Sequence, residues 1–503
     1  MIQLRSLSTQ DSTFVQSFEL TNGASSGDLL SERITKGKLK VGFLGTAYFE
    51  YYRMYQGIQE QAQKDIQKIA DFLESECDLV FPGIVDTLDK SNSAGVLFAS
   101  EKVEAIIIAE ATYSVDYLVH QALLNVPKDI PLFLFASQSE AKIHYSGGYA
   151  ASLLNSGPMG IVQFACSLQK MERFLPYETT VGCIDEPEVQ EKIKAFIKVR
   201  TAIRDLHSMN IGLIGHIFRG MYDFQYDKTE LTGKLGPHVI DIDIKHLTDI
   251  YDEINDDDLL VKEIIDKAKA DYEIDKEITD VDLKKAAKLG AALEKTLSQY
   301  KLDGMALLGQ HFIEARTQTT SYMGIGSILS KDAGLIVTEG DVLGLIVSFV
   351  MKTVSGETAF FGEWEEIDVE KNELLILGHG FLDPKTARKD RPIKLGSSCE
   401  DWGWEGTAPG FECTLTPGPA TLGALISHNG KWKMLISEVT IPDTPPLKIN
   451  ESTVIIKPEE NVRDYYSHVI EFGFGHHVMV SPGHIGRELE MFAKAKGFEI
   501  CKP

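Results

Sequence analysis

Short apolar runs alternate with longer helical patterns as far as about residue 352. The runs form two sets, one at residues 40–44, 78–81, 105–109 and 131–136 and another at 210–215, 238–244, 303–308 and 335–337. Helical periodicity separates them, at residues 48–74, 115–124, 186–209 and 283–300. Strands that alternate with helices of about ten residues or more are typical of parallel sheets. The expected fold class is therefore α/β, with two doubly wound, Rossmann- or flavodoxin-like units that are alike in architecture but not in sequence.

From about residue 353 the pattern changes to a period of two. Glycines, prolines and all four tryptophans gather within residues 362–432. Four runs are predicted to form antiparallel strands, at residues 374–378, 410–416, 421–427 and 431–439. Asn429-Gly430 is a favoured hairpin turn between the last two runs, and a helical pattern at 487–496 closes the chain. This segment is expected to be β-rich and barrel-like.

A chain of 503 residues is too long for one hydrophobic core. The patterns divide it into a polar N-terminal extension (1–36), a first α/β domain (37–180), a second α/β domain (181–352) and a β-rich C-terminal domain (353–503). Folds commonly place binding sites where domains meet. We therefore expect the functional site at a junction, completed by the C-terminal domain.

The charge balance is strongly acidic: 50 Lys and Arg stand against 74 Asp and Glu, a net charge of −24. Such a chain has no basic surface for nucleic acid or an anionic membrane, so we expect neither as a partner. The longest apolar stretch, 342–351, is about half as long as a membrane-spanning helix. The six cysteines include no Cys-x-x-Cys pair, and the first residues lack a signal-peptide pattern. These features predict a cytoplasmic protein with reduced thiols.

Carboxylates and histidines near predicted strand ends are the best candidates for chemistry. The chain has no Walker loop, Gly-x-Ser-x-Gly elbow, His-Glu-x-x-His or Gly-x-Gly-x-x-Gly motif after its first strand. The candidates are the acidic residues Glu339, Asp341 and Glu363, with His379 and the pair His476-His477. Carboxylates together with imidazoles form a donor set that suits Mn²⁺, Co²⁺ or Mg²⁺ better than a thiolate-bound metal.

Each of these residues also has a simpler interpretation. A single acidic residue is more often part of a solvated turn or a helix cap. A single histidine in a strand, such as His379, is more often a hydrogen-bonded structural residue. The adjacent histidines are harder to explain in this way, because they lie in a glycine-rich turn whose ordering is entropically unfavourable.

Several motifs resemble the L-arabinose isomerase family and, more distantly, L-fucose isomerase. They are Glu339-Gly340-Asp341, Thr358-Ala359-Phe360-Phe361-Gly362-Glu363, Leu377-Gly378-His379, Thr416-Pro417-Gly418-Pro419-Ala420 and Gly475-His476-His477. In that family two glutamates and two histidines hold Mn²⁺. The resemblance implies that Glu339, Glu363, His379 and, of the pair, His477 are the ligands here.

The resemblance also implies the activity and the assembly. It implies a metal-dependent aldose–ketose isomerase that works through a cis-enediol, with Glu339 and Glu363 as acid and base. Leu134–Gln138 is similar to a family strand that ends in a glutamine reaching a neighbouring subunit's active site. Gln138 is thus expected to bind substrate in a homo-oligomer, a trimer or hexamer. The family histidine three residues further on is replaced by Ala141.

Three more polar residues are candidates for binding sugar hydroxyls. His216 follows the run 210–215, and Gln310 and His311 follow the run 303–308. Open α/β sheets bind ligands at the carboxyl ends of their strands, although a loop that caps the next helix would look the same. Two other functions stay open: a metal-independent sugar-binding or sensing protein, and another metal-dependent sugar enzyme such as an aldolase or hydrolase.

Overall fold

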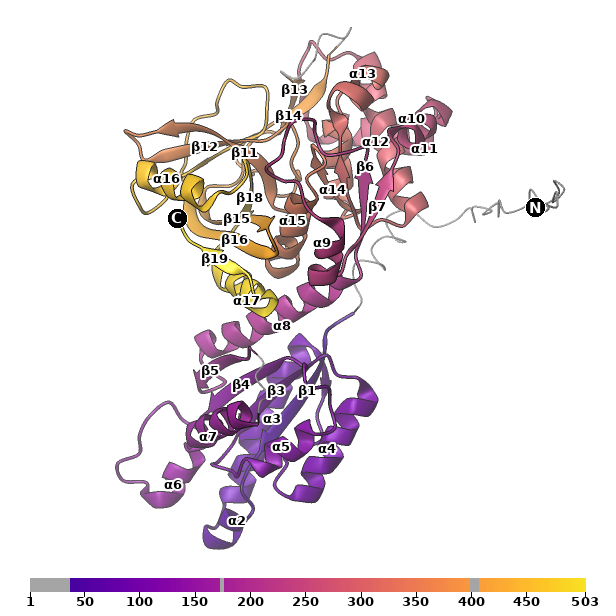
Figure 1. The fold of residues 1–503 in the computed structure, drawn as a ribbon. Helices are drawn as coiled ribbons and strands as arrows, with labels where there is room; N and C mark the ends of the chain where they lie inside the picture. Colours follow the sequence, from indigo (N-terminus) through magenta and orange to yellow (C-terminus); the bar gives the residue numbers. More distant parts are fainter. Residues whose placement is uncertain (1–36, 172–175, 399–406) are drawn as a thin grey trace, which may run out of the picture.

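The computed structural model describes residues 37–171, 176–398 and 407–503, with the side chains of Gln310 and His311 excepted. The polar extension 1–36 and the Trp402-Gly403-Trp404 segment lie outside the described residues. Two open parallel sheets are followed by a larger, mixed β-sheet, with helices packed on the sheet faces (Figure 1). The predicted α/β class with a β-rich C-terminal part is confirmed.

The first sheet is parallel and has the strand order β2-β1-β3-β4-β5, which is the flavodoxin-like order. Its strands are β1 (Lys40–Thr46), β2 (Asp78–Val80), β3 (Ala105–Glu110), β4 (Leu132–Ser137) and β5 (Glu178–Gly182). Its helices are α2 (Glu50–Met54), α3 (Ile58–Glu76), α4 (Leu88–Glu101), α5 (Tyr117–Leu123), α6 (Gly148–Leu154) and α7 (Gly157–Lys170). Successive strand residues enter two separate apolar clusters, one on each face of the sheet, which explains why the strands are continuous apolar runs.

The second sheet is also parallel and has the order β10-β9-β6-β7. Its strands are β6 (Asn210–Ile214), β7 (His238–Ile242), β9 (Gly304–Leu307) and β10 (Leu335–Thr338). The helical segments are α8 (Pro187–His207), α9 (Lys228–Leu235), α10 (Ile244–Glu253), α11 (Leu259–Asp271), α12 (Asp280–Tyr300), the π-helical turn η1 (Gly309–Ile313), α13 (Glu314–Thr317), α14 (Tyr322–Ser330) and α15 (Val342–Ser355). Counted from its own first strand, this sheet repeats the order of the first four strands of the other sheet.

The C-terminal sheet has the order β17-β12-β11-β18-β15-β16-β19. Its elements are β11 (Phe360–Asp368), β12 (Glu373–Leu377), β15 (Gly418–His428), β16 (Lys431–Ile441), β17 (Thr453–Ile456), α16 (Val462–Phe472), β18 (His477–Pro482), α17 (Gly486–Lys496) and β19 (Glu499–Cys501). Thr440 of β16 exchanges two backbone hydrogen bonds with Lys457 (3.0 and 2.7 Å), just beyond β17. This contact joins the two sides of the curved sheet, as a barrel-like fold requires. A small sheet of β8 (Glu273–Ile274), β13 (Lys394–Ser397) and β14 (Pro409–Glu412) flanks it.

Helix α15 joins the second sheet to the C-terminal sheet. It contains the longest apolar stretch of the sequence and is buried on nearly all sides, as expected of a helix without a polar face. A single apolar cluster contains α15 together with strands of both sheets. In the described ranges, no helix combines the length and the apolar character needed to cross a membrane.

Candidate metal centre

The four predicted ligands meet where the second sheet borders the C-terminal sheet. Glu339 directly follows β10, Glu363 lies in β11, His379 follows β12, and His477 begins β18. Each offers one ligand atom, and these atoms all lie within 4.8 Å of one another. Residues separated by more than a hundred positions in the sequence therefore form one compact group.

The chain turns sharply at Glu339 to place its carboxylate in this group. Glu339 has a φ of +60°, which is uncommon for a non-glycine residue, and Gly340 follows at +75°. The Glu339 carbonyl accepts a hydrogen bond from the Phe218 amide at 2.9 Å. A Cβ atom at position 340 would lie 2.7 Å from the His216 carbonyl oxygen, so only glycine fits there. The loop after β6 thus fixes the position of Glu339.

Strand register places the other ligands. Glu363 lies opposite His477 in the β11–β18 pair and opposite Leu377 in the β11–β12 pair. His379 therefore emerges next to Glu363, and its Nε2 lies 2.6 Å from Glu363 Oε1. The Nε2 atom of His477 lies 3.2 Å from Glu339 Oε2 and 3.7 Å from Glu363 Oε1.

The residues of this group are largely buried, and each changes the pKa values of the others. Glu339 and His477 are each 4% exposed. Burial opposes ionisation of Glu339, but hydrogen bonds from His476 and His477 lower its pKa to about 2. Contacts from His379 and His477 likewise overcome burial and hold the pKa of Glu363 far below its ordinary value. Burial disfavours a charged His477, yet Asp341, Glu339 and Glu363 raise its pKa to about 10. Both glutamates are therefore ionised, as cation binding requires.

Asp341 orients His477. It caps α15 by accepting a hydrogen bond from the Gly344 amide at 2.9 Å, and its other oxygen accepts one from His477 Nδ1 at 3.0 Å. The Nε2 atom is thereby left facing the glutamates. A carboxylate bound to the far nitrogen of a histidine is the usual way in which proteins orient a metal ligand. Phe224 stacks on the same imidazole with a centroid distance of 4.8 Å, which fixes the plane of the ring.

The second histidine of the pair has a different environment. His476 Nδ1 donates to Asp223 Oδ2 at 2.6 Å, and its Nε2 lies 3.7 Å from Glu339 Oε2. Only His477 belongs to the four-residue group within 4.8 Å. Asp223 and Phe224 were not predicted from the sequence. They lie in the loop between β6 and α9, and Asp223 is separated from His476 by 253 positions, so no local pattern could indicate the contact.

The donor set fits a divalent cation. Two carboxylates and two imidazoles from rigid strands or strand ends supply four ligand atoms with two negative charges. Such mixed oxygen and nitrogen ligands suit Mn²⁺, Co²⁺ and related first-row ions. The chemistry of these donors does not by itself select one of these metals.

The structure places the remaining predicted residues as follows. His216 is exposed at the carboxyl end of β6, and its ring lies 5.8 Å from that of Phe312. Gln310 and His311 belong to the turn that follows β9, on the same edge of the sheet as Glu339, but their side chains lie outside the described residues. Gln138 directly follows β4 of the first sheet and lies in a small pocket lined also by Lys68 and Cys183. It is not among the side chains grouped around Glu339 within this chain.

Comparison with known proteins gives distant relatives that are sugar isomerases. A sulfoquinovose isomerase from Alkalicoccus urumqiensis is 22% identical over 321 residues, which cover 62% of this chain and 69% of the relative. L-arabinose isomerases from Acidothermus cellulolyticus and Bifidobacterium longum are each 22% identical, over 65% and 64% of this chain and 66% and 65% of the relatives. The chain thus spans about two thirds of the length of these proteins, and no protein-family model matches it. It is a distant homologue of sulfoquinovose isomerase and L-arabinose isomerase, which confirms the resemblance indicated by the sequence motifs.

Proposed function

We propose that the protein is a metal-dependent aldose–ketose isomerase. The observation that carries this proposal is the buried group of Glu339, Glu363, His379 and His477, which forms at the positions that the family resemblance singles out. Distant homology to sugar isomerases supports it. We propose Mn²⁺ as the metal, with Co²⁺ or Mg²⁺ as alternatives, because of the mixed donor set.

The two glutamates carry the proton transfers in this proposal. When bound, the metal would supply Lewis-acid polarisation of the sugar carbonyl. One of Glu339 and Glu363 removes the proton from C2 of the open-chain sugar, and the other moves the hydroxyl proton, through a cis-enediol. Both carboxylates have lowered pKa values and are therefore ionised at neutral pH, which is the form that a general base needs. His216, Gln310 and His311 are proposed to bind sugar hydroxyls, because their backbone lies at the same edge of the second sheet.

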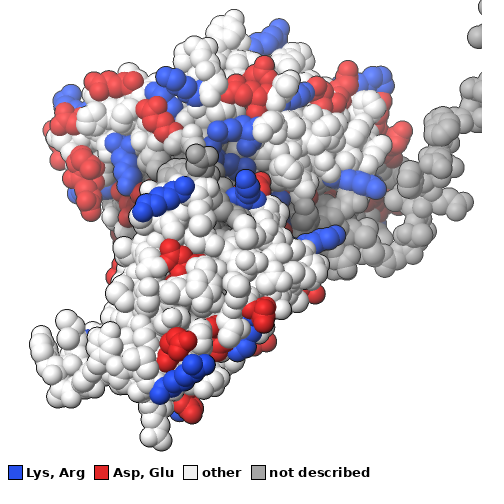
Figure 2. All heavy atoms as spheres, turned by 60° about the horizontal axis from the view of Figure 1, so that its bottom comes forward, with Lys and Arg blue, Asp and Glu red and all other residues white. Residues whose placement is uncertain are grey.

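We also propose that the protein acts as a homo-oligomer in which Gln138 enters a neighbour's site. Support comes from the surface near Gln138, where Ile143, Tyr145 and Tyr149 are 76%, 96% and 63% exposed. The lobe at the lower left of Figure 2, which corresponds to α6 and the loop before it in Figure 1, shows almost no charged side chains on the face seen. An exposed apolar area of this kind is a common mark of an interface. Light scattering should detect a trimer or hexamer, and a fully active monomer would contradict the assembly.

One experiment separates the candidate functions. The protein is stripped with a chelator and assayed with and without Mn²⁺ on a panel of aldoses that includes L-arabinose, L-fucose and sulfoquinovose. NMR identifies the products. An isomerase yields the ketose of one sugar only when metal is present, whereas an aldolase yields shorter fragments. Sugar binding without metal and without any conversion would refute the proposal in favour of a binding protein.

A further inference from the structure

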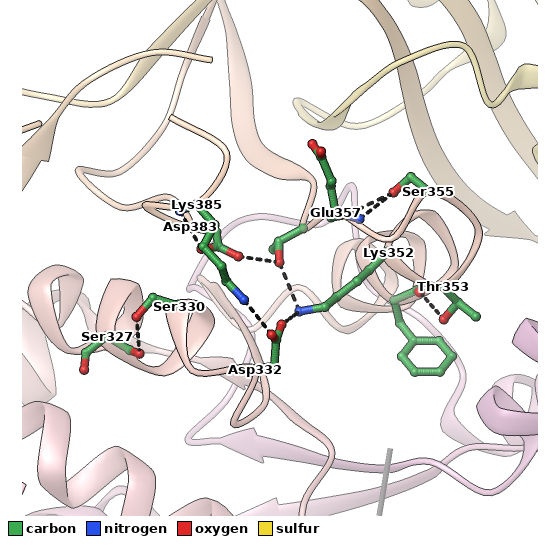
Figure 3. Close-up of polar contacts among 11 residues, drawn as sticks. Ser327, Ser330, Asp332, Lys352, Thr353, Ser355, Glu357, Asp383 and Lys385 are labelled. Atoms are coloured by element: carbon green, nitrogen blue, oxygen red, sulfur yellow. Dashed lines mark hydrogen bonds and ion pairs between the residues drawn. The ribbon is translucent and has the colours of Figure 1, made fainter. Parts of the chain in front are cut away.

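Five residues at the C-terminal end of α15, the end away from Asp341, form a closed ring of polar contacts (Figure 3). Asp332 binds two lysines at once, Lys352 at 2.6 Å and Lys385 at 2.5 Å. Lys352 also donates to the Thr358 hydroxyl at 3.1 Å, and that hydroxyl donates to Asp383 Oδ2 at 2.8 Å. The Lys385 amide donates to Asp383 Oδ1 at 3.0 Å and completes the ring.

The ring connects the segments that carry three of the four candidate ligands. Asp332 lies in the turn before β10, the strand that ends at Glu339. Thr358 lies just before β11, which contains Glu363, and Asp383 follows His379 in the loop after β12. Each of these segments is therefore tied to the others at a second point, away from the ligand atoms themselves.

The buried part of the ring is its strongest part. Thr358 and Asp383 are each 4% exposed, so water cannot replace the hydrogen bond between them. The side chains of Asp332 and Lys385 are 52% and 48% exposed, and such ion pairs contribute little. The Thr358–Asp383 contact is therefore the link expected to matter for the site.

The position of the loop that carries His379 depends on the contacts that the loop makes with its neighbours. Glycines flank His379, and Gly380 has a φ of +66°, so the backbone here has little intrinsic stiffness. The β11–β12 ladder holds the loop up to Leu377. Backbone hydrogen bonds from Gly378 to Ser452 and from Phe411 to Gly380 (2.7 Å each) hold it against the C-terminal segments. Two side-chain contacts join this loop to the start of β11: the polar link between Asp383 and Thr358, and the stacking of Phe381 on Phe361 with ring centroids 6.1 Å apart.

We propose that Thr358 and Asp383 are positioning residues for the metal centre: their hydrogen bond sets the separation between Glu363 and His379. This inference rests on the proposed metal-binding function. Without the link, the His379 loop can move relative to β11, and the two ligands no longer meet a cation in one fixed geometry. Loss of a residue that hydrogen-bonds to a metal ligand typically lowers metal affinity by about 10–100-fold. We take the lower end of this range, about 10-fold, because Thr358 and Asp383 contact each other and not the ligand side chains.

The test compares two substitutions of one residue with a matched control. Thr358→Val removes the hydroxyl at nearly constant volume, and Thr358→Ser restores it. Thr353→Val is the control, because Thr353 lies on α15, is half-buried and donates only to the Phe349 carbonyl of its own helix, at 2.9 Å (Figure 3). Mn²⁺ affinity is measured by EPR titration of the full chain, and the visible spectrum of bound Co²⁺ reports the ligand geometry.

We expect Thr358→Val to weaken Mn²⁺ binding by about 10-fold and to alter the Co²⁺ spectrum. Thr358→Ser and Thr353→Val should match the wild type in both measurements. If Thr358→Val binds like the wild type, or if Thr358→Ser shows the same loss, the inference is wrong. Thr358→Ala, which also removes the hydroxyl, provides a second test with the same expected loss if the valine variant does not fold. A wild-type protein that binds no Mn²⁺ or Co²⁺ would instead refute the proposed metal function itself.

Discussion

Glu110, at the carboxyl end of β3, should make the stability of the first sheet depend on pH. Its side chain is fully buried. One oxygen accepts a hydrogen bond from the Ser114 amide at 3.1 Å, and the other has no hydrogen-bond partner in the described part of the chain. Burial raises the pKa of this carboxyl to about 8. The folded protein therefore keeps Glu110 protonated at neutral pH, whereas the unfolded chain ionises it.

The size of the effect follows from the two pKa values. The pKa of Glu110 rises from the ordinary value of 4.5 to about 8. At about 1.4 kcal/mol for each pKa unit, this difference corresponds to about 5 kcal/mol of folding free energy. A carboxyl with a raised pKa in the folded state stabilises the fold least at high pH. Its contribution is fully present below pH 4.5, falls as the pH rises towards 8, and is constant above that value. We treat 5 kcal/mol as an upper figure, because local opening admits water.

The substitution Glu110→Gln isolates this contribution. The amide has nearly the same shape and does not ionise, so any packing effect is the same at every pH. Hydrogen–deuterium exchange of peptides from β3 gives the free energy of opening in both proteins between pH 5 and 9. The free energy of opening of the variant, relative to that of the wild type, should rise by several kcal/mol between pH 5 and pH 8. A difference between the two proteins that stays constant over this range would refute the reasoning.

Three substitutions test the metal centre and its supports. Glu339→Gln should lower turnover of the cognate sugar at least about a hundredfold without changing the circular dichroism spectrum, because it removes an acid–base group; near-normal turnover would remove Glu339 from catalysis. Asp341→Asn should weaken Mn²⁺ binding by about 10–100-fold in a calorimetric titration, because His477 loses the carboxylate that orients it; unchanged affinity would show that the orientation does not depend on this charge. Gly340→Ala should lower the free energy of unfolding by about 1–3 kcal/mol, because the left-handed backbone and the nearby His216 carbonyl leave no room for a Cβ; denaturant unfolding that matches the wild type would contradict this account.

Much of the α/β architecture can be predicted from the sequence, because strands buried on both faces are continuous apolar runs. The ends of the helices, and helices with a weak apolar pattern, are harder to predict. The helical pattern at 48–74 is divided into α2 and α3 by Gly57, which has a φ of +85°. Helix α4 was not predicted, because the buried face that it presents includes small residues such as Ser91, Ala94 and Gly95 rather than a strong apolar stripe.

The candidate metal centre could likewise be predicted only in part. The four candidate ligands could be named because short motifs around them resemble a known family, but the contacts that orient them join distant parts of the chain. Asp341 and His477 are 136 positions apart, and Asp223 and His476 are 253 positions apart. Only the register of β11 with β18 brings Glu363 opposite His477, and register follows from the packing of the whole sheet rather than from local sequence.

The continuous core around α15 limits how this protein can be divided or recombined. Glu339 and Asp341 lie at the start of α15, while Glu363, His379 and His477 come from the sheet that α15 packs against. A C-terminal fragment that begins at residue 353 would lack most of α15 and would also lack Glu339. If α15 were separated from both sheets, it would expose an apolar surface on most of its sides. The C-terminal sheet therefore cannot be exchanged as an independent unit. A change of substrate is more readily reached through the loops after β6 and β9 or through the first sheet, which has separate apolar clusters of its own.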